Sequence, residues 1–235
     1  MQQYLNDFRT GVKDGVPIAL GYLSVSFTFG MMASEGISAL SAVLISMTNL
    51  TSAGQVAGVL IITSGGGLLE LGLSQLVINL RYALMSLSLS QRLHPSTRLR
   101  ERLFMAFGVT DEIFAVSVNH NELLGPRYFY GLMLLPYIGW SLGTLLGACA
   151  GTLLPSFLTS VLGIALYGMF IAIIVPPARQ NRKVLAVVLI AIVLSCAFRF
   201  LPLLSGVSQG AAIIFCAVFA SLAGAVFFPV GREGT

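Results

Sequence analysis

Eight apolar stretches follow one another along this chain, with only short polar loops between them. They cover residues 16–33, 38–63, 68–89, 103–119, 128–150, 156–175, 184–200 and 210–230. Only 9% of the residues are charged, whereas soluble domains carry about 25% charge. No polar stretch is long enough to fold by itself. We therefore expect an all-α, multi-pass membrane protein with a single transmembrane transport domain over residues 1–235.

The sequence divides the expected domain into an N-terminal segment and two halves. Residues 1–13 place apolar side chains at helical spacing among charged ones, which predicts a short helix on the membrane surface. A first span is expected to follow, with Asp14 as its N-cap and Pro17 in its first turn. Residues 14–119 then form a first half that carries the polar motifs, and residues 120–235 form a second helical half.

Polar residues interrupt two of the apolar stretches. The stretch 38–63 contains the sequence TNLTSAGQ at 48–55, and the stretch 103–119 contains Thr110, Asp111 and Glu112. The 17 residues of the second stretch reach only about 26 Å as a helix, which is less than the roughly 30 Å of a bilayer core. Both stretches are therefore candidates for broken or re-entrant elements, and the alternative is that both are ordinary kinked spans.

The loop charges favour the re-entrant arrangement. With eight full crossings, the four arginines between residues 92 and 102 would face the opposite side from the other basic loops. If both interrupted stretches enter and leave on one side, every loop Lys and Arg faces the cytoplasm, as the positive-inside rule requires. This predicts six full spans, two broken elements that enter from opposite faces, and cytoplasmic termini. Such a plan is common in secondary transporters with inverted repeats. The net charge of +4 then reflects these loops, and no nucleic-acid partner is expected.

The adjacent carboxylates Asp111 and Glu112 lie in an otherwise apolar run. A carboxylate at membrane depth costs about 2.5–3.5 kcal/mol on insertion scales, so the pair marks a candidate functional site. Adjacent helical residues point about 100° apart. One is expected to face a pathway while the other caps a half-helix, helped by Thr110. Asp111 is the favoured group for a proton or a substrate amine, because a buried carboxyl can hold a proton near neutral pH. The alternative is that both carboxylates cap the helix and pair with Arg81.

The third stretch contains Asn79, Arg81 and Tyr82 within its apolar sequence. Arg81 can neutralise Asp111 or bind a substrate carboxylate with its two-pronged guanidinium. Alternatively it can extend to the membrane surface. The interruption at 48–55 adds hydroxyls, amides and backbone near a glycine, and its candidate binding residues are Asn49, Thr51, Ser52, Gly54 and Gln55. Unwound backbone of this kind binds the charged ends of amino acids in transporters, although small residues also serve close packing.

Glycines recur at every fourth position from Gly139 to Gly151. This pattern is typical of close helix packing, and the sequence does not say whether the neighbour belongs to the same chain. The two histidines lack the spacing of metal ligands, and no sequence pattern of a hydrolase or intramembrane protease is present. We expect no metal, no cofactor and no enzymatic activity.

Four blocks of this sequence resemble the AzlC family of bacterial branched-chain amino-acid exporters. They are DGVPIALGYLSVSFTFG (14–30), TNLTSAGQ (48–55), INLRYALMSLSL (78–89) and FGVTDEIFA (107–115). The later spans are similar mainly in hydropathy. Tyr82 stands where the family often has histidine, which removes one candidate proton carrier. The family's break usually reads A-G-A-S-Q, whereas this chain has TSAGQ at 51–55.

The resemblance implies a secondary transporter in the bacterial inner membrane. It would export branched-chain amino acids, methionine or similar apolar ones, with protons as the coupling ion and a small AzlD-like membrane subunit as partner. Two alternatives are an accessory membrane subunit without a pathway and an intramembrane enzyme. Arg81 and the acidic pair argue against an accessory subunit, because a scaffold has no need of them.

Overall fold

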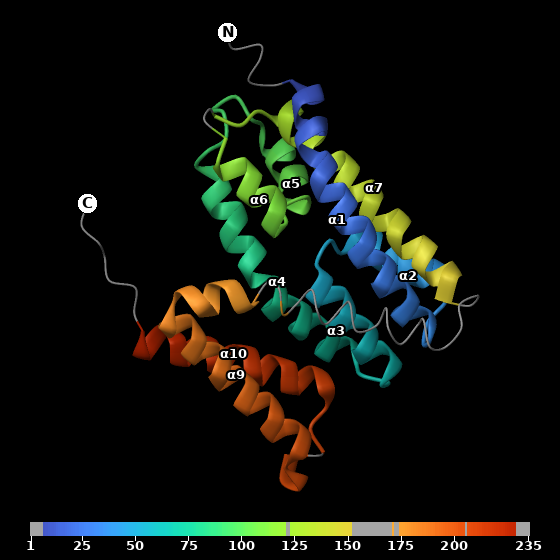
Figure 1. Cartoon of the computed structure of the whole chain (residues 1–235), viewed down its shortest axis with the longest axis vertical. Helices are drawn as coiled ribbons and strands as arrows, with labels where there is room; N and C mark the ends of the chain where they lie inside the picture. Colours follow the sequence, from blue (N-terminus) through green and yellow to red (C-terminus); the bar gives the residue numbers. More distant parts are fainter. Residues whose placement is uncertain (1–6, 121–122, 152–170, 172–173, 205, 229–235) are drawn as a thin grey trace. The chain divides into compact units, whose positions relative to one another are not determined.

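The computed structural model describes residues 7–120, 123–151, 171, 174–204 and 206–228, and its regular structure is helical throughout these ranges (Figure 1). The helices are α1 (Phe8–Ser34), α2 (Ala39–Thr48), α3 (Ser52–Thr63), α4 (Leu68–Ser90), α5 (Leu99–Phe107), α6 (Asp111–Val118), α7 (Pro126–Gly151), α9 (Arg182–Phe200) and α10 (Gln209–Phe227). A short 3-10 turn, η1 (Pro202–Leu204), separates α9 from α10. The prediction of an all-α protein is confirmed for the described residues.

Four of the described helices are long and apolar enough to cross a membrane: α1, α7, α9 and α10. The helices α2 and α3 are apolar but shorter. Helix α4 is 23 residues long and includes the polar residues Glu70, Asn79 and Arg81. These helices confirm a multi-pass membrane protein. The predicted span at 156–175 lies almost entirely outside the described residues, and the number of full spans and the inverted repeat stay predictions.

Contacts within the chain divide it into two compact units. The first unit consists of residues 1–56 and 79–163, and the second of residues 57–78 and 164–235. Helices α3 and α4 each contribute residues to both units, so the division does not follow the order of the sequence. Every site residue predicted from the sequence belongs to the first unit. The single domain and its two sequential halves stay predictions.

Helix α1 begins earlier than the sequence indicated. Asp7 is its N-cap and accepts a hydrogen bond from the Arg9 backbone N–H at 3.1 Å. The helix then continues without interruption to Ser34, so Asp14 lies within it and accepts a hydrogen bond from the Tyr128 hydroxyl at 2.7 Å. The predicted N-cap at Asp14 is wrong. Residues 8–13 belong to the same helix as the first span, so they do not form a separate surface helix, and residues 1–6 lie outside the described residues.

Helices α1 and α7 form the most extensive helix pair of the first unit, because glycines bring their backbones together. A Cβ atom added to Gly139 would lie 2.6 Å from the Ala19 carbonyl oxygen, and one added to Gly147 would collide with the Phe27 carbonyl. Helix α1 contributes its own close approaches at Gly11, Gly15 and Gly30. The α7 glycines at 139, 143 and 147 therefore pack against a helix of the same chain, which the sequence alone did not identify.

Both predicted interruptions are present as breaks between helices. Residues 49–51 separate α2 from α3, and residues 108–110 separate α5 from α6. Thr110 caps α6, since its Oγ1 accepts a hydrogen bond from the Ile113 backbone N–H at 3.4 Å. The hydroxyl in this position satisfies one of the N–H groups that a helix start leaves without an intrahelical acceptor. Whether the two elements cross or re-enter stays a prediction.

In the second unit, Glu70 holds the start of α10. The Gly210 backbone N–H donates to Glu70 Oε1 at 2.7 Å, and a Cβ at Gly210 would lie 2.5 Å from Glu70 Cγ. A carboxylate is favourable at a helix N-terminus, where the helix dipole is positive. The contact joins the first turn of α4 to the pair formed by α9 and α10.

Candidate functional site

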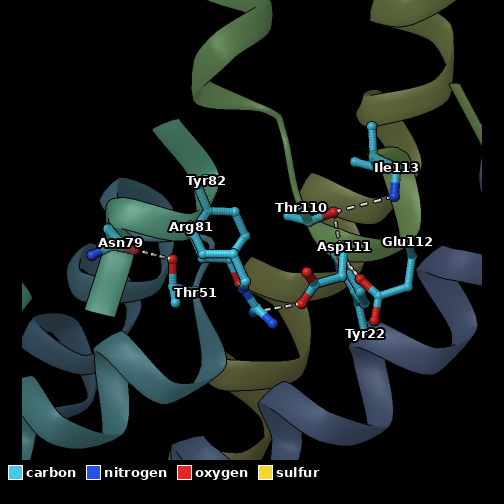
Figure 2. Close-up of polar contacts among 9 residues, drawn as sticks. All are labelled: Tyr22, Thr51, Asn79, Arg81, Tyr82, Thr110, Asp111, Glu112 and Ile113. Atoms are coloured by element: carbon cyan, nitrogen blue, oxygen red, sulfur yellow. Dashed lines mark hydrogen bonds and ion pairs between the residues drawn. The ribbon is translucent and has the colours of Figure 1, made fainter. Parts of the chain in front are cut away.

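Helix α4 contacts both helix breaks within a few residues of its length (Figure 2). Thr51, in the first break, donates a hydrogen bond from its hydroxyl to Asn79 Oδ1 at 2.6 Å. Arg81, two residues further along α4, reaches Asp111 at the start of α6. Residues from three separate sequence blocks thus come together in the first unit.

Arg81 and Asp111 form an ion pair, with 2.7 Å between Arg81 Nη2 and Asp111 Oδ2. The pair is only partly covered, because the side chains are 55% and 36% exposed respectively. Arg81 Nη2 also donates to the Tyr82 hydroxyl at 3.2 Å, and its guanidinium carbon lies 5.1 Å from the centre of the Tyr82 ring. The guanidinium is therefore oriented toward Asp111 by a neighbour on its own helix. Of the alternatives that the sequence left open for Arg81, the pair with Asp111 is present.

The two adjacent carboxylates point to different helices. Asp111 faces α4, whereas Glu112 Oε2 accepts a hydrogen bond from the Tyr22 hydroxyl of α1 at 2.5 Å (Figure 2). The same hydroxyl lies 2.6 Å from Thr110 Oγ1. The divergence is what the 100° step of a helix predicts. Thr110 provides the cap of α6, while Glu112 joins α6 to α1.

Helix α7 contributes residues that the sequence analysis overlooked. The ring of Trp140 meets the ring of Tyr22 edge-on, with 5.1 Å between their centres. Trp140 Nε1–H donates to the Asn49 carbonyl at 3.3 Å, and the Tyr137 hydroxyl donates to the Met47 carbonyl at 3.2 Å. These donors satisfy carbonyls that the end of α2 leaves without intrahelical partners. The sequence feature that could have revealed them is a Trp or Tyr, an aromatic residue with a polar tip, inside an otherwise apolar span.

The contacts close into a circuit. The first break binds α4, α4 binds α6 through the ion pair, α6 binds α1 through Tyr22, and α1 meets Trp140 of α7, which returns to the first break. We name this set of contacts the polar ring, and its residues are Tyr22, Asn49, Thr51, Asn79, Arg81, Asp111, Glu112 and Trp140. It fixes both helix breaks while leaving the Arg81–Asp111 pair partly exposed.

The remaining predicted residues lie at or next to the first break. Asn49 Oδ1 accepts a hydrogen bond from the Thr51 backbone N–H at 3.2 Å. Ser52 and Gly54 stand in the first turn of α3. Gln55 is fully buried, and its Oε1 accepts a hydrogen bond from Ser46 Oγ at 2.8 Å. The structure therefore places all the predicted residues on the two breaks, the adjoining first turns of α3 and α6, or the facing segment of α4.

The Tyr22 hydroxyl is expected to stabilise the polar ring. Tyr22→Phe leaves Glu112 without this donor, so we expect the unfolding free energy to fall by about 1–2 kcal/mol. The measurement is thermal unfolding of the purified protein in detergent. Tyr130→Phe is the matched control, because the Tyr130 ring packs edge-on against Phe104 at 5.4 Å and lies outside the polar ring. Equal unfolding midpoints for the two variants would contradict the role of the hydroxyl.

Four membrane-length apolar helices among the described residues define a multi-pass membrane protein, and its first unit contains two polar helix breaks. Comparison with known proteins gives the family: residues 17–154 match the AzlC protein family, and the chain belongs to it. Every predicted site residue lies within the matched range. The resemblance seen in the sequence blocks is confirmed.

Relatives of this chain are described as membrane proteins. It is 36% identical over 172 residues to an uncharacterized membrane protein of Archaeoglobus fulgidus, covering 72% of this chain and 75% of the relative. It is 27% identical over 184 residues to the inner membrane protein YgaZ of Escherichia coli, covering 75% of each chain. An uncharacterized membrane protein of Helicobacter pylori is 26% identical over 187 residues, 78% of this chain and 81% of the relative. No solved structure matches the chain.

Proposed function

We propose that this chain is the large subunit of a secondary transporter that exports branched-chain amino acids, methionine or similar apolar amino acids. It acts in the bacterial inner membrane with cytoplasmic termini, uses the proton gradient, and assembles with a small AzlD-like membrane subunit. The partly exposed Arg81–Asp111 ion pair between two helix breaks carries the proposal. Membership of the AzlC family supports the transporter class.

The ion pair is complementary to a free amino acid. A zwitterion carries one carboxylate and one ammonium group, and the two side chains offer a cation and an anion 2.7 Å apart. The substrate inserts between them, so that its carboxylate binds Arg81 and its ammonium binds Asp111. One ion pair is replaced by two and no charge is left without a partner, which matters in a weakly screened environment. The exposed fractions of both side chains allow a ligand to reach them.

Proton coupling follows from the same exchange. The Asp111 carboxylate binds either the substrate ammonium or a proton, so an inward-moving proton takes the place of the amino acid that leaves. Tyr82 does not replace the histidine of related chains as a proton carrier, because a phenol does not titrate near neutral pH. The proton therefore binds at Asp111. A scaffold without a pathway would not need this exposed pair, and the sequence has no pattern of a hydrolase or intramembrane protease, so we propose neither alternative.

The proposal is tested by amino-acid efflux from dipeptide-loaded cells that express the chain with its small partner subunit. Wild-type cells are expected to export leucine, isoleucine, valine or methionine, and a protonophore is expected to slow this efflux. Asp111→Asn is expected to reduce efflux to the level of cells without the transporter, with normal amounts of protein in the membrane. Asp14→Asn is the matched control, because Asp14 binds Tyr128 outside the polar ring.

Two results would contradict the proposal in different ways. Wild-type efflux of none of these amino acids, with both subunits in the membrane, would exclude the substrate class. Normal efflux from the Asp111→Asn variant would keep the transporter but reduce Asp111 to a structural partner of Arg81.

A further inference from the structure

A fully buried amide beside the first helix break has one end held and the other end without a partner. Gln55 of α3, Ser46 of α2 and Thr144 of α7 all have no exposed surface. Ser46 Oγ lies 2.7 Å from Thr144 Oγ1 and donates to Gln55 Oε1 at 2.8 Å. Gln55 Nε2 has no hydrogen-bond partner within the described structure.

An unpaired buried donor requires an explanation. Buried polar groups in proteins are nearly always hydrogen-bonded, because leaving one unpaired loses its interaction with water without replacement. An apolar side chain of similar length at position 55 would fill the same space at no such cost. The hydroxyls of Ser46 and Thr144, which belong to two other helices, hold this amide in one position. This arrangement favours a ligand that brings an acceptor to Nε2.

The surroundings of the amide favour a negatively charged acceptor. The Gln55 backbone N–H donates to the Thr51 carbonyl at 2.9 Å, so Gln55 belongs to the first turn of α3. The helix dipole makes this end of α3 positive. Helical side chains tilt toward the N-terminus of their helix, which brings the amide to the same end. Thr51 in turn binds Asn79, close to Arg81 on α4 (Figure 2).

We propose that Gln55 Nε2 donates a hydrogen bond to the substrate carboxylate, and that Ser46 and Thr144 are positioning residues that hold the amide in this orientation. Ser46 donates to Gln55 Oε1, so the N–H2 end of the amide is left for the ligand. Thr144 Oγ1 lies 2.7 Å from Ser46 Oγ and donates to the Trp140 carbonyl at 3.2 Å, which fixes the position of the Ser46 hydroxyl. The inference rests on the proposed amino-acid transport and assigns the carboxylate-binding part of the site.

The test measures ligand binding to the purified complex of this chain with its small partner subunit, by thermal stabilisation in detergent. The probes are leucine and leucinol, which has an alcohol in place of the carboxylate. Leucine is expected to stabilise the wild type at much lower concentrations than leucinol. Gln55→Met is expected to raise the half-saturating leucine concentration about tenfold or more, and to leave that for leucinol nearly unchanged.

Variants of the two positioning residues, Ser46 and Thr144, are expected to weaken leucine binding in a characteristic way. Thr144→Val and Ser46→Ala are expected to raise the half-saturating leucine concentration by about threefold to tenfold. Thr144→Ser keeps the hydroxyl, so its half-saturating leucine concentration should equal that of the wild type. In the Gln55→Met background, Thr144→Val is expected to add nothing, because the amide that it orients is gone. Ser74→Ala is the matched control, since it removes another fully buried hydroxyl that is hydrogen-bonded, here to the Leu71 carbonyl at 2.9 Å.

The failures are distinguishable. Two results would overturn the assignment of Gln55 while leaving an amino-acid transporter. One is unchanged leucine binding in Gln55→Met. The other is a further rise in the half-saturating leucine concentration when Thr144→Val is added to Gln55→Met, as large as the rise that Thr144→Val causes in the wild type. A wild-type complex that is stabilised by no apolar amino acid would overturn the proposed function and, with it, the ligand assigned to Gln55. The Thr144→Val and Ser46→Ala variants decide the question if Gln55→Met does not fold.

Discussion

Arg81→Met is expected to abolish amino-acid export by cells that carry both subunits. The variant removes the cation that binds the substrate carboxylate and leaves Asp111 without the partner it now has at 2.7 Å. A hydrogen bond to a charged group contributes about 1.5–3 kcal/mol, which corresponds to a loss of roughly 10- to 150-fold in binding. Desolvating the lone Asp111 carboxylate adds to this loss. The measurement is the initial rate of leucine efflux, normalised to the amount of protein in the membrane.

Companion variants separate charge from geometry at this position. Arg81→Lys keeps the charge but not the two-pronged donor, so we expect partial efflux at a higher internal leucine concentration. The double variant Arg81→Met with Asp111→Asn removes both charges and leaves neither without a partner, so we expect normal amounts of protein in the membrane but no export. Arg100→Met, at an exposed arginine of α5, is the control. Wild-type efflux from Arg81→Met would exclude Arg81 from the binding site.

The positions of the helices follow closely from the sequence where a bilayer imposes their length. The stretch predicted at 128–150 is α7 (Pro126–Gly151), and that at 184–200 is α9 (Arg182–Phe200). The two breaks were also predictable, because polar residues in the middle of an apolar stretch favour an end of a helix over its interior. Apolar length and polar interruption are local properties, and a local pattern reveals them.

Part of the site was predictable for a similar reason. Two opposite charges in apolar surroundings have a strong reason to pair, so a pair between Arg81 and Asp111 was one of the alternatives that the sequence suggested. The partners Tyr22 and Trp140 were not found, because an aromatic residue in a span serves packing and hydrogen bonding alike. Their role depends on α1 and α7 lying side by side, and the spacing of residues within one helix does not contain that information.

The start of α1 shows how packing overrides local capping signals. Asp14 has the chemistry of an N-cap, but the close approach of α7 to Gly11 and Gly15 continues the helix to Asp7. The Asp14 carboxylate is then available to accept the Tyr128 hydroxyl. The glycine repeat of α7 likewise predicted a close neighbour without identifying it, since the spacing specifies only a smooth helix face.

Gly147→Leu is expected to disrupt the α1–α7 pair and prevent the protein from accumulating in the membrane. Even a Cβ atom at this position would overlap the Phe27 carbonyl of α1, and a backbone carbonyl cannot rotate away as a side chain can. Inserting bulk into a close-packed contact costs about 1–3 kcal/mol when neighbours can adjust, and more when they cannot. We therefore expect a loss of 3 kcal/mol or more, on the order of the upper limit for such substitutions. The measurements are the amount of folded protein in the membrane and its unfolding midpoint in detergent.

A matched substitution isolates the contact from the cost of a larger side chain. Gly21→Leu on α1 meets no atom within 4 Å of its Cβ, so it should accumulate and unfold like the wild type. The α1–α7 pair also holds Tyr22 against Trp140, with 5.1 Å between the ring centres. The milder variant Gly147→Ala should therefore lower both the unfolding midpoint and the rate of export, because the polar ring depends on this packing. A wild-type midpoint for Gly147→Leu would mean that α1 and α7 do not make this contact in the membrane.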